Sequence, residues 1–125
     1  MSQRPVPWDI VVFGVLMILS GMGDLSIIIA YPTYSLPFFG SKPEGLFGLL
    51  IKCIHPPMHF ISGYGAIYGR KWAYPLLMLY SVYGMVNAIV NRILLPPPHN
   101  IRTIFMLGTL LVMGYLYFRR SAFKR

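Results

Sequence analysis

Charged residues are scarce in this sequence, and acidic residues are the rarest of them. The chain of 125 residues holds 11 Lys or Arg and only 3 Asp or Glu. A soluble domain carries about a quarter charged residues, so 11% is too few to hydrate the surface of a small globule. Hydrophobic residues make up 56% of the chain, and they come in blocks. This pattern excludes an ordinary soluble domain and indicates a membrane protein.

The sequence also lacks the features of several functional classes. Cys53 is its single cysteine, so no intramolecular disulfide can form. The first apolar block is too long for the core of a signal peptide, and no small-residue cleavage pattern follows it. No hydrolase, kinase or nucleotide-binding motif is present, and no nucleophile is paired with a base. We therefore expect no enzyme activity from this chain alone.

Four apolar blocks are long enough to cross a bilayer, which takes roughly 20 residues. They cover residues of about 9–31, 44–69, 72–95 and 101–118. The linkers between them are short, which leaves no room for a soluble module. The sequence therefore predicts an all-α integral membrane protein. We expect a compact four-transmembrane-helix bundle that forms a single domain over residues 1–125.

Basic residues divide unevenly between the two faces that four crossings would create. The larger group falls on the side of the termini, and it comprises Arg4, Arg70, Lys71, Arg119, Arg120, Lys124 and Arg125. The other face has Lys42, Arg92 and Arg102, with Glu44 near the first of these. Basic residues in short loops mark the cytoplasmic side. We expect both termini on the cytoplasmic or matrix side of a bacterial, archaeal or organelle inner membrane, with no nucleic-acid partner.

The second block contains the unusual stretch IKCIHPPMHF at residues 51–60. Proline removes a helix hydrogen bond and clashes with the preceding turn, and it disfavours helical geometry in the residue before it. Because Pro56 and Pro57 are adjacent, we predict that span two breaks at His55–Pro56. Lipid cannot satisfy the freed backbone groups, so the break should face protein or water. We expect the carbonyls of Lys52 and Cys53 to accept hydrogen bonds from asparagine amides of span three.

Several polar side chains fall at similar depths in the predicted spans. Counting from the external end of each span, they lie four to eight residues inside, or roughly 6–12 Å deep, with the two histidines deeper. The predicted polar cluster comprises Asp24, Lys52, His55, His59, Asn87 and Asn91. A buried charge in lipid is costly, so Asp24 needs a partner. Lys52 is the first choice and Arg92 the second.

Metal and cofactor sites have little support in the sequence. His55, His59 and Asp24 resemble a site of two histidines and one carboxylate. However, the prolines disturb the spacing of the two histidines, and the charge of Lys52 would repel a cation. A haem with two histidine ligands needs them on opposite sides of the ring, whereas His55 and His59 share one segment and His99 lies in a loop. No cofactor is predicted.

Two functions remain open from the sequence. The leading one is an accessory or scaffold subunit of a larger membrane complex, with the lipid bilayer and other membrane subunits or further copies of this chain as partners. The alternative is a small carrier, or a proton or ion pathway, that uses the polar cluster. The residues identify neither a substrate nor a partner.

Overall fold

The computed structural model describes residues 5–124, so Arg4 and Arg125 of the larger basic group lie outside the described residues. Within that range the secondary structure is helical, apart from one isolated β-bridge in a loop. The four long helices are α1 (Trp8–Ala30), α2 (Gly45–Ile67), α3 (Ala73–Leu94) and α4 (Asn100–Phe118), followed by the short 3-10 helix η1 (Arg120–Ala122). Their bounds lie within two residues of the predicted spans.

Three of the four helices are long and apolar enough to cross a membrane: α1, α3 and α4. Helix α2 has the same length as α1, at 23 residues. Its composition differs, because one lysine, two histidines and two prolines interrupt its apolar residues. The all-helical class is confirmed. That α2 also crosses the membrane stays a prediction.

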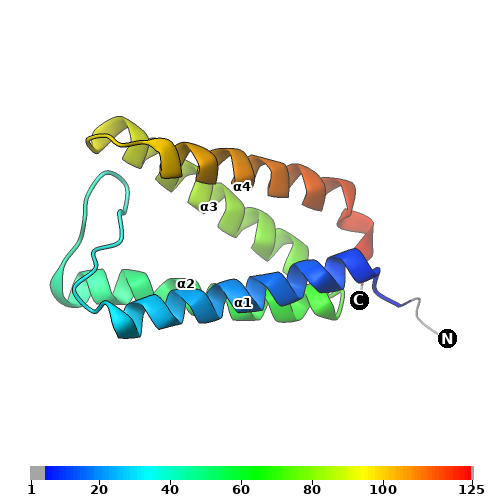
Figure 1. Ribbon diagram of the computed structural model, residues 1–125. Coiled ribbons are helices and arrows are strands. Elements are labelled where there is room, and N and C mark those ends of the chain that lie inside the picture. Colours follow the sequence, from blue (N-terminus) through cyan, green and yellow to red (C-terminus); the bar gives the residue numbers. More distant parts are fainter. Residues whose placement is uncertain (1–4, 125) are drawn as a thin grey trace.

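The helices form two antiparallel hairpins, α1–α2 and α3–α4, which diverge from one another (Figure 1). Helices α1 and α2 make the closest packing. A Cβ atom on Gly14 would lie 2.7 Å from the Gly63 carbonyl oxygen, and one on Gly63 would lie equally close to the Gly14 oxygen. Only glycine permits this backbone contact, which is a common way for helices to associate in lipid.

The hairpins meet at the end of the molecule that carries both termini, which we call the closed end (Figure 1). The apolar core lies here and comprises Ile10, Ala66, Ala73, Leu77, Leu116 and Phe123. The Asp9 carboxylate accepts two hydrogen bonds from the Arg119 guanidinium, at 3.0 and 2.8 Å, and one from the Tyr115 hydroxyl at 2.7 Å. The hydrogen bonds with Asp9 raise the pKa of Arg119 above its ordinary value, so this clamp between α1 and the end of α4 remains charged.

At the opposite end, which we call the cavity end, the hairpins stand apart and residues 31–44 connect α1 to α2. We call this segment the bridging loop, because it extends across the gap toward α3 (Figure 1). Its tip is a tight turn in which Phe38 and Ser41 exchange backbone hydrogen bonds of 2.8 and 3.1 Å. Phe39 and Gly40 at the centre of the turn have φ angles of 46° and 84°, a left-handed geometry typical of two-residue turns.

The predicted break in span two is wrong, because α2 continues through Pro56 and Pro57. A full break would free many more backbone groups than the two amide donors that the prolines remove, and lipid cannot satisfy those groups. Two side chains near the prolines also form hydrogen bonds with the backbone of α2. His55 Nδ1 lies 3.0 Å from the Ile51 carbonyl oxygen, and Ser62 donates to the Met58 oxygen at 2.5 Å.

Candidate functional site

A cavity of about 590 Å³ opens between the hairpins at the cavity end. All four helices and the bridging loop contribute to its walls. The lining residues are Ser20, Asp24, Ile27, Ile28, Tyr31, Tyr34, Leu36, Lys52, His55, His59, Tyr80, Tyr83, Gly84, Asn87 and Phe105. Its volume falls in the range of about 300–1,000 Å³ that is usual for small-molecule sites.

The structure brings five of the six residues of the predicted polar cluster to this cavity. They are Asp24 from α1, Lys52, His55 and His59 from α2, and Asn87 from α3. Asn91, the sixth, is buried at 4% exposure and does not line the cavity. The shared depth that the sequence indicates therefore corresponds to one region of the structure, although the contacts within it differ from those predicted.

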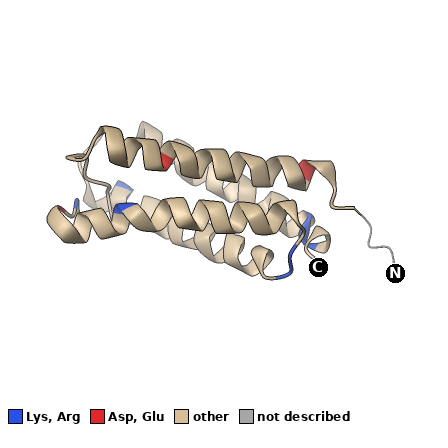
Figure 2. Ribbon diagram, turned by 90° about the horizontal axis from the view of Figure 1, so that it is seen from below, with Lys and Arg blue, Asp and Glu red and all other residues tan. Residues whose placement is uncertain are grey.

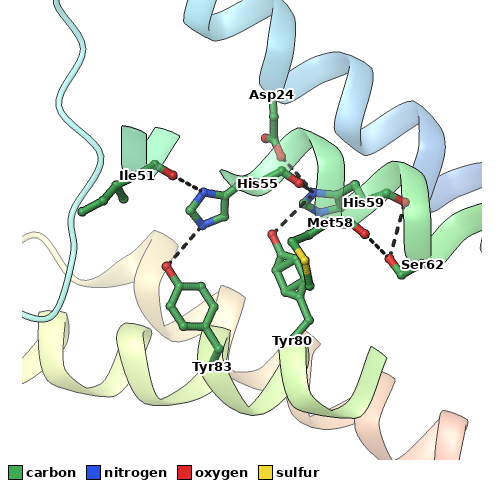
Figure 3. Close-up of polar contacts among 8 residues, drawn as sticks. All are labelled: Asp24, Ile51, His55, Met58, His59, Ser62, Tyr80 and Tyr83. Atoms are coloured by element: carbon green, nitrogen blue, oxygen red, sulfur yellow. Dashed lines mark hydrogen bonds and ion pairs between the residues drawn. The ribbon is translucent and has the colours of Figure 1, made fainter. Parts of the chain in front are cut away.

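Asp24 contacts His59 rather than Lys52, which corrects the predicted ion pair. Asp24 Oδ2 lies 3.2 Å from His59 Nδ1 (Figure 3). Lys52 precedes His59 by seven residues on α2, which places their backbones on the order of 10 Å apart along the helix. His59 is thus the residue of α2 that reaches the level of Asp24. Arg92, the second choice, donates instead to the Thr103 hydroxyl at 3.1 Å.

Lys52 holds the bridging loop. Its ammonium group donates to the carbonyl oxygens of Pro32, at 3.1 Å, and Tyr34, at 2.7 Å. These carbonyls belong to an irregular segment, in which no helix ladder satisfies them. At 8% exposure Lys52 is almost fully buried, and its charge is solvated by backbone dipoles instead of water. Lys52 is therefore paired with main-chain carbonyl groups of the bridging loop, which the sequence alone could not reveal.

Asn87 and Asn91 also hold the bridging loop, which is a second correction. The sequence predicts that their amides satisfy the carbonyls of Lys52 and Cys53. Instead, Asn87 Oδ1 accepts from the Phe39 amide and Asn91 Oδ1 accepts from the Gly40 amide, both at 2.7 Å. Asn87 also donates to the Pro37 carbonyl at 3.3 Å. The tight turn of the loop exposes these two amides toward α3.

The hydrogen bonds of the two histidines assign a proton to one ring nitrogen of each. His59 Nδ1 lies 2.8 Å from the His55 carbonyl oxygen, and His55 Nδ1 lies 3.0 Å from that of Ile51. A carbonyl oxygen can only accept, so both Nδ1 atoms are donors. On His55, the Tyr83 hydroxyl is then placed to donate to Nε2 at 3.4 Å. On His59, the Tyr80 oxygen lies 3.5 Å from the same Nδ1 that faces Asp24 (Figure 3).

The residues that the sequence indicated as a weak metal site do not converge as ligands. Across residues 5–124, no group of three His, Cys, Asp or Glu side chains is arranged to hold a metal ion. His59 Nδ1 lies between the His55 carbonyl oxygen and Asp24, whereas His55 Nε2 faces Tyr83 (Figure 3). The arrangement is a hydrogen-bonded wall of a cavity rather than a coordination shell.

Sequence reasoning missed the aromatic part of this site. Tyr31 and Phe105 carry no signal beyond their apolar surroundings, and no residue of α4 was predicted to lie at the site. Tyr80, Tyr83 and Asn87 follow one another at three and four residues on α3, and that helical spacing is the signal that could have placed the tyrosines here. With Tyr34, these rings line the same cavity as the polar groups. The cavity therefore combines a carboxylate, imidazoles and phenols with mainly apolar walls.

No known protein family, no curated protein and no solved structure matches this chain. The functional argument therefore depends on the cavity alone.

Proposed function

We propose that this protein is a four-span integral membrane protein that binds a small solute in the cavity between its hairpins, as a carrier does. The observation that carries this proposal is a cavity of about 590 Å³ with Asp24, His55 and His59 in its walls, inside helices of spanning length. Ionisable groups within membrane segments usually face an interior or aqueous cavity and mark a functional site.

The position of α2 supports a fourth crossing. Helices α1 and α2 have equal lengths of 23 residues and pack side by side from the closed end, at Gly14 and Gly63, to Gly21 and His59 (Figures 1 and 2). Each is about 34 Å long, which matches a hydrocarbon core of about 30 Å. If α1 crosses the bilayer, α2 must lie at the same depth.

The charge distribution agrees with this placement. Lys and Arg gather toward the two ends of the helices, leaving the middle of the bundle free of basic residues (Figure 2). Large apolar side chains are exposed on all four helices, including Leu19, Leu50, Leu79 and Leu111. Such surfaces are suited to contact with lipid on the outside of the bundle.

A proton pathway through the histidine rings receives less support from the same geometry. A ring passes a proton onward when donor and acceptor sit on opposite nitrogens, whereas Asp24 and Tyr80 both approach Nδ1 of His59. His55 uses its Nδ1 for a backbone carbonyl, which cannot take part in proton transfer. We therefore favour solute binding.

Cysteine labelling tests the cavity. In a chain with Cys53 replaced by alanine, Ser20→Cys places a thiol in the cavity wall, whereas Leu19→Cys places one on the outer surface of α1. A hydrophilic thiosulfonate reagent needs water to reach and ionise the thiol. We expect Ser20→Cys to react at least about tenfold faster than Leu19→Cys. Equal, slow reaction at both positions would overturn the proposal.

The same method tests the number of crossings. Single cysteines at Thr33, Arg70 and Ser121 report the bridging loop, the α2–α3 turn and the C-terminal region. With four crossings and the termini inside, an impermeant maleimide labels Thr33→Cys in intact cells and the other two only after the cells are opened. Should α2 stay outside the bilayer, all three positions would lie on the outer face and be labelled together.

A role as a subunit of a larger complex is the second candidate, and α4 favours it. Among the residues of α4, only Leu116 is buried and more than half are exposed, so much of its surface is available to lipid or to another protein. A cysteine at Leu111, which is 74% exposed, can be crosslinked in native membranes. A discrete larger species would support the subunit role, and its absence would leave α4 to lipid.

A further inference from the structure

We infer that the ligand of the cavity is an organic cation with an apolar or aromatic body, whose charge is bound at Asp24; this inference rests on the proposed function. It follows from the inventory of charges and hydrogen-bond partners around the cavity. That inventory leaves one carboxylate facing a space with aromatic walls.

The Asp24 carboxylate has no lysine or arginine partner among the described residues. Its one close contact is His59 through Oδ2. The side chain is 36% exposed, and it lines the cavity. Asp24 Oδ1 is therefore available to a ligand that brings a positive charge.

Apart from His59, no ionisable group that lines the cavity forms a hydrogen bond or ion pair with Asp24. On α2, the Lys52 ammonium group donates two hydrogen bonds to the bridging loop. Its backbone lies on the order of 10 Å from that of His59 along the helix. His55 hydrogen-bonds within α2 and to Tyr83 on α3. His59 Nδ1 lies closer to the His55 carbonyl oxygen, at 2.8 Å, than to Asp24, at 3.2 Å, and Tyr80 is an uncharged phenol. Helix α4 adds only the ring of Phe105.

The aromatic rings favour the same class of ligand. Tyr31, Tyr34, Tyr80, Tyr83 and Phe105 line the same cavity as Asp24. The face of an aromatic ring attracts a cation, and several rings around one position form the cages that recognise quaternary ammonium groups. An anion would meet the carboxylate and the negative faces of the rings. A neutral apolar molecule would fill the cavity without satisfying Asp24.

Binding of a matched pair of probes tests this inference on the unmodified protein. Benzyltrimethylammonium carries a permanent positive charge, and neopentylbenzene is its neutral isostere, with carbon in place of nitrogen. Each is titrated into the purified protein in a non-ionic detergent, and saturable binding is read as a rise in Tm. We expect the cation to bind at least about tenfold more tightly than the isostere. Equal affinity, or preference for the isostere, would overturn the inference.

Variants then locate the charge. Asp24→Asn should weaken binding of benzyltrimethylammonium by about ten- to a hundredfold and leave neopentylbenzene unchanged, which also shows that the variant is folded. Glu44→Gln is the matched control, because it removes an exposed acidic charge near the bridging loop, outside the walls of this cavity. If both variants weaken cation binding equally, the effect comes from long-range attraction between the cation and any acidic side chain. The assignment of the binding site to Asp24 is then wrong.

The outcomes separate this inference from the proposed function. If Ser20→Cys reacts with the hydrophilic reagent but benzyltrimethylammonium does not bind, the cavity is accessible and the cation assignment fails. If Ser20→Cys is as unreactive as Leu19→Cys, the solute cavity itself fails, and the cation assignment fails with it.

Discussion

The two ends of this bundle use the same kinds of residue in different ways. At the closed end, Asp9 is bound by a guanidinium and a phenol and lies beside an apolar core. At the cavity end, Asp24 has a single histidine contact beside an open space. One carboxylate of α1 is fully used within the fold, and the other is not. The comparison separates a residue that holds the fold together from one available to a ligand.

The polar residues of the cavity end are divided in the same way. Lys52, Asn87 and Asn91 bind backbone groups of the bridging loop. They are structural, and they account for much of the polarity that made α2 and α3 look unusual in the sequence. Asp24 and His59 remain as the part of the predicted cluster that faces the cavity with unused hydrogen-bonding capacity.

The largest expected effect comes from the helix contact that supports the closed end. Gly63→Ala would place a methyl group 2.7 Å from the Gly14 carbonyl oxygen, a backbone atom that cannot move alone. We expect a loss of about 1–3 kcal/mol, as in other overpacked sites, measured by unfolding in detergent. Gly108→Ala in α4 is the control, because nothing lies within 4 Å of its added methyl group. It should be neutral or gain up to about 1 kcal/mol. Equal losses would show that the contact is not tight.

A comparison of the two carboxylates should give the next largest effect. Asp9→Asn removes the negative charge and one of the two oxygens that accept three hydrogen bonds, whereas Asp24→Asn alters a single contact with a histidine. We expect Asp9→Asn to lower the Tm by a few degrees and Asp24→Asn to change it less. The Tm of the ligand-free protein depends on contacts within the fold, and Asp24 makes fewer of them. A larger loss for Asp24→Asn would reverse the assignment of the two roles.

The smallest effect on overall stability is expected in the bridging loop. Asn91→Leu keeps the approximate size of the side chain but removes the acceptor of the Gly40 amide. We expect the Gly40 amide, and to a lesser extent that of Phe39, to exchange with deuterium about tenfold faster, with little change in Tm. The Tyr31 amide, which donates to Ile27 within the helix end, serves as the internal reference. Unchanged exchange at Gly40 would mean that other contacts hold the loop.

The sequence predicted the helices well because the length of each apolar block is determined by consecutive residues. Each helix is a mainly apolar block whose ends fall near Pro, Gly or charged residues, so the bounds agree within two residues. The depth of Asp24, Lys52, His55, His59 and Asn87 follows from the same count along the helices. Periodicity and rise per residue are enough to place side chains in a layer.

The partners of those side chains could not be read from the sequence in the same way. Lys52, Asn87 and Asn91 bind a loop whose conformation depends on a left-handed turn at Phe39 and Gly40. The local sequence of the loop does not indicate that this turn points toward α3. The proline pair gave a local preference for a break, but the cost of exposing backbone groups is set by the surroundings of the whole helix. The cost of exposing these groups therefore outweighed the local preference of the two prolines for a break.

The divergence of the two hairpins has a consequence for the bilayer itself. In the proposed orientation, the cavity end and the closed end lie in opposite leaflets (Figure 1). The protein therefore occupies a larger area in the leaflet of the bridging loop than in the leaflet of the termini. Lipids around such a tapered body must tilt to fill the difference, so the protein should concentrate where the membrane bends toward the side of its termini.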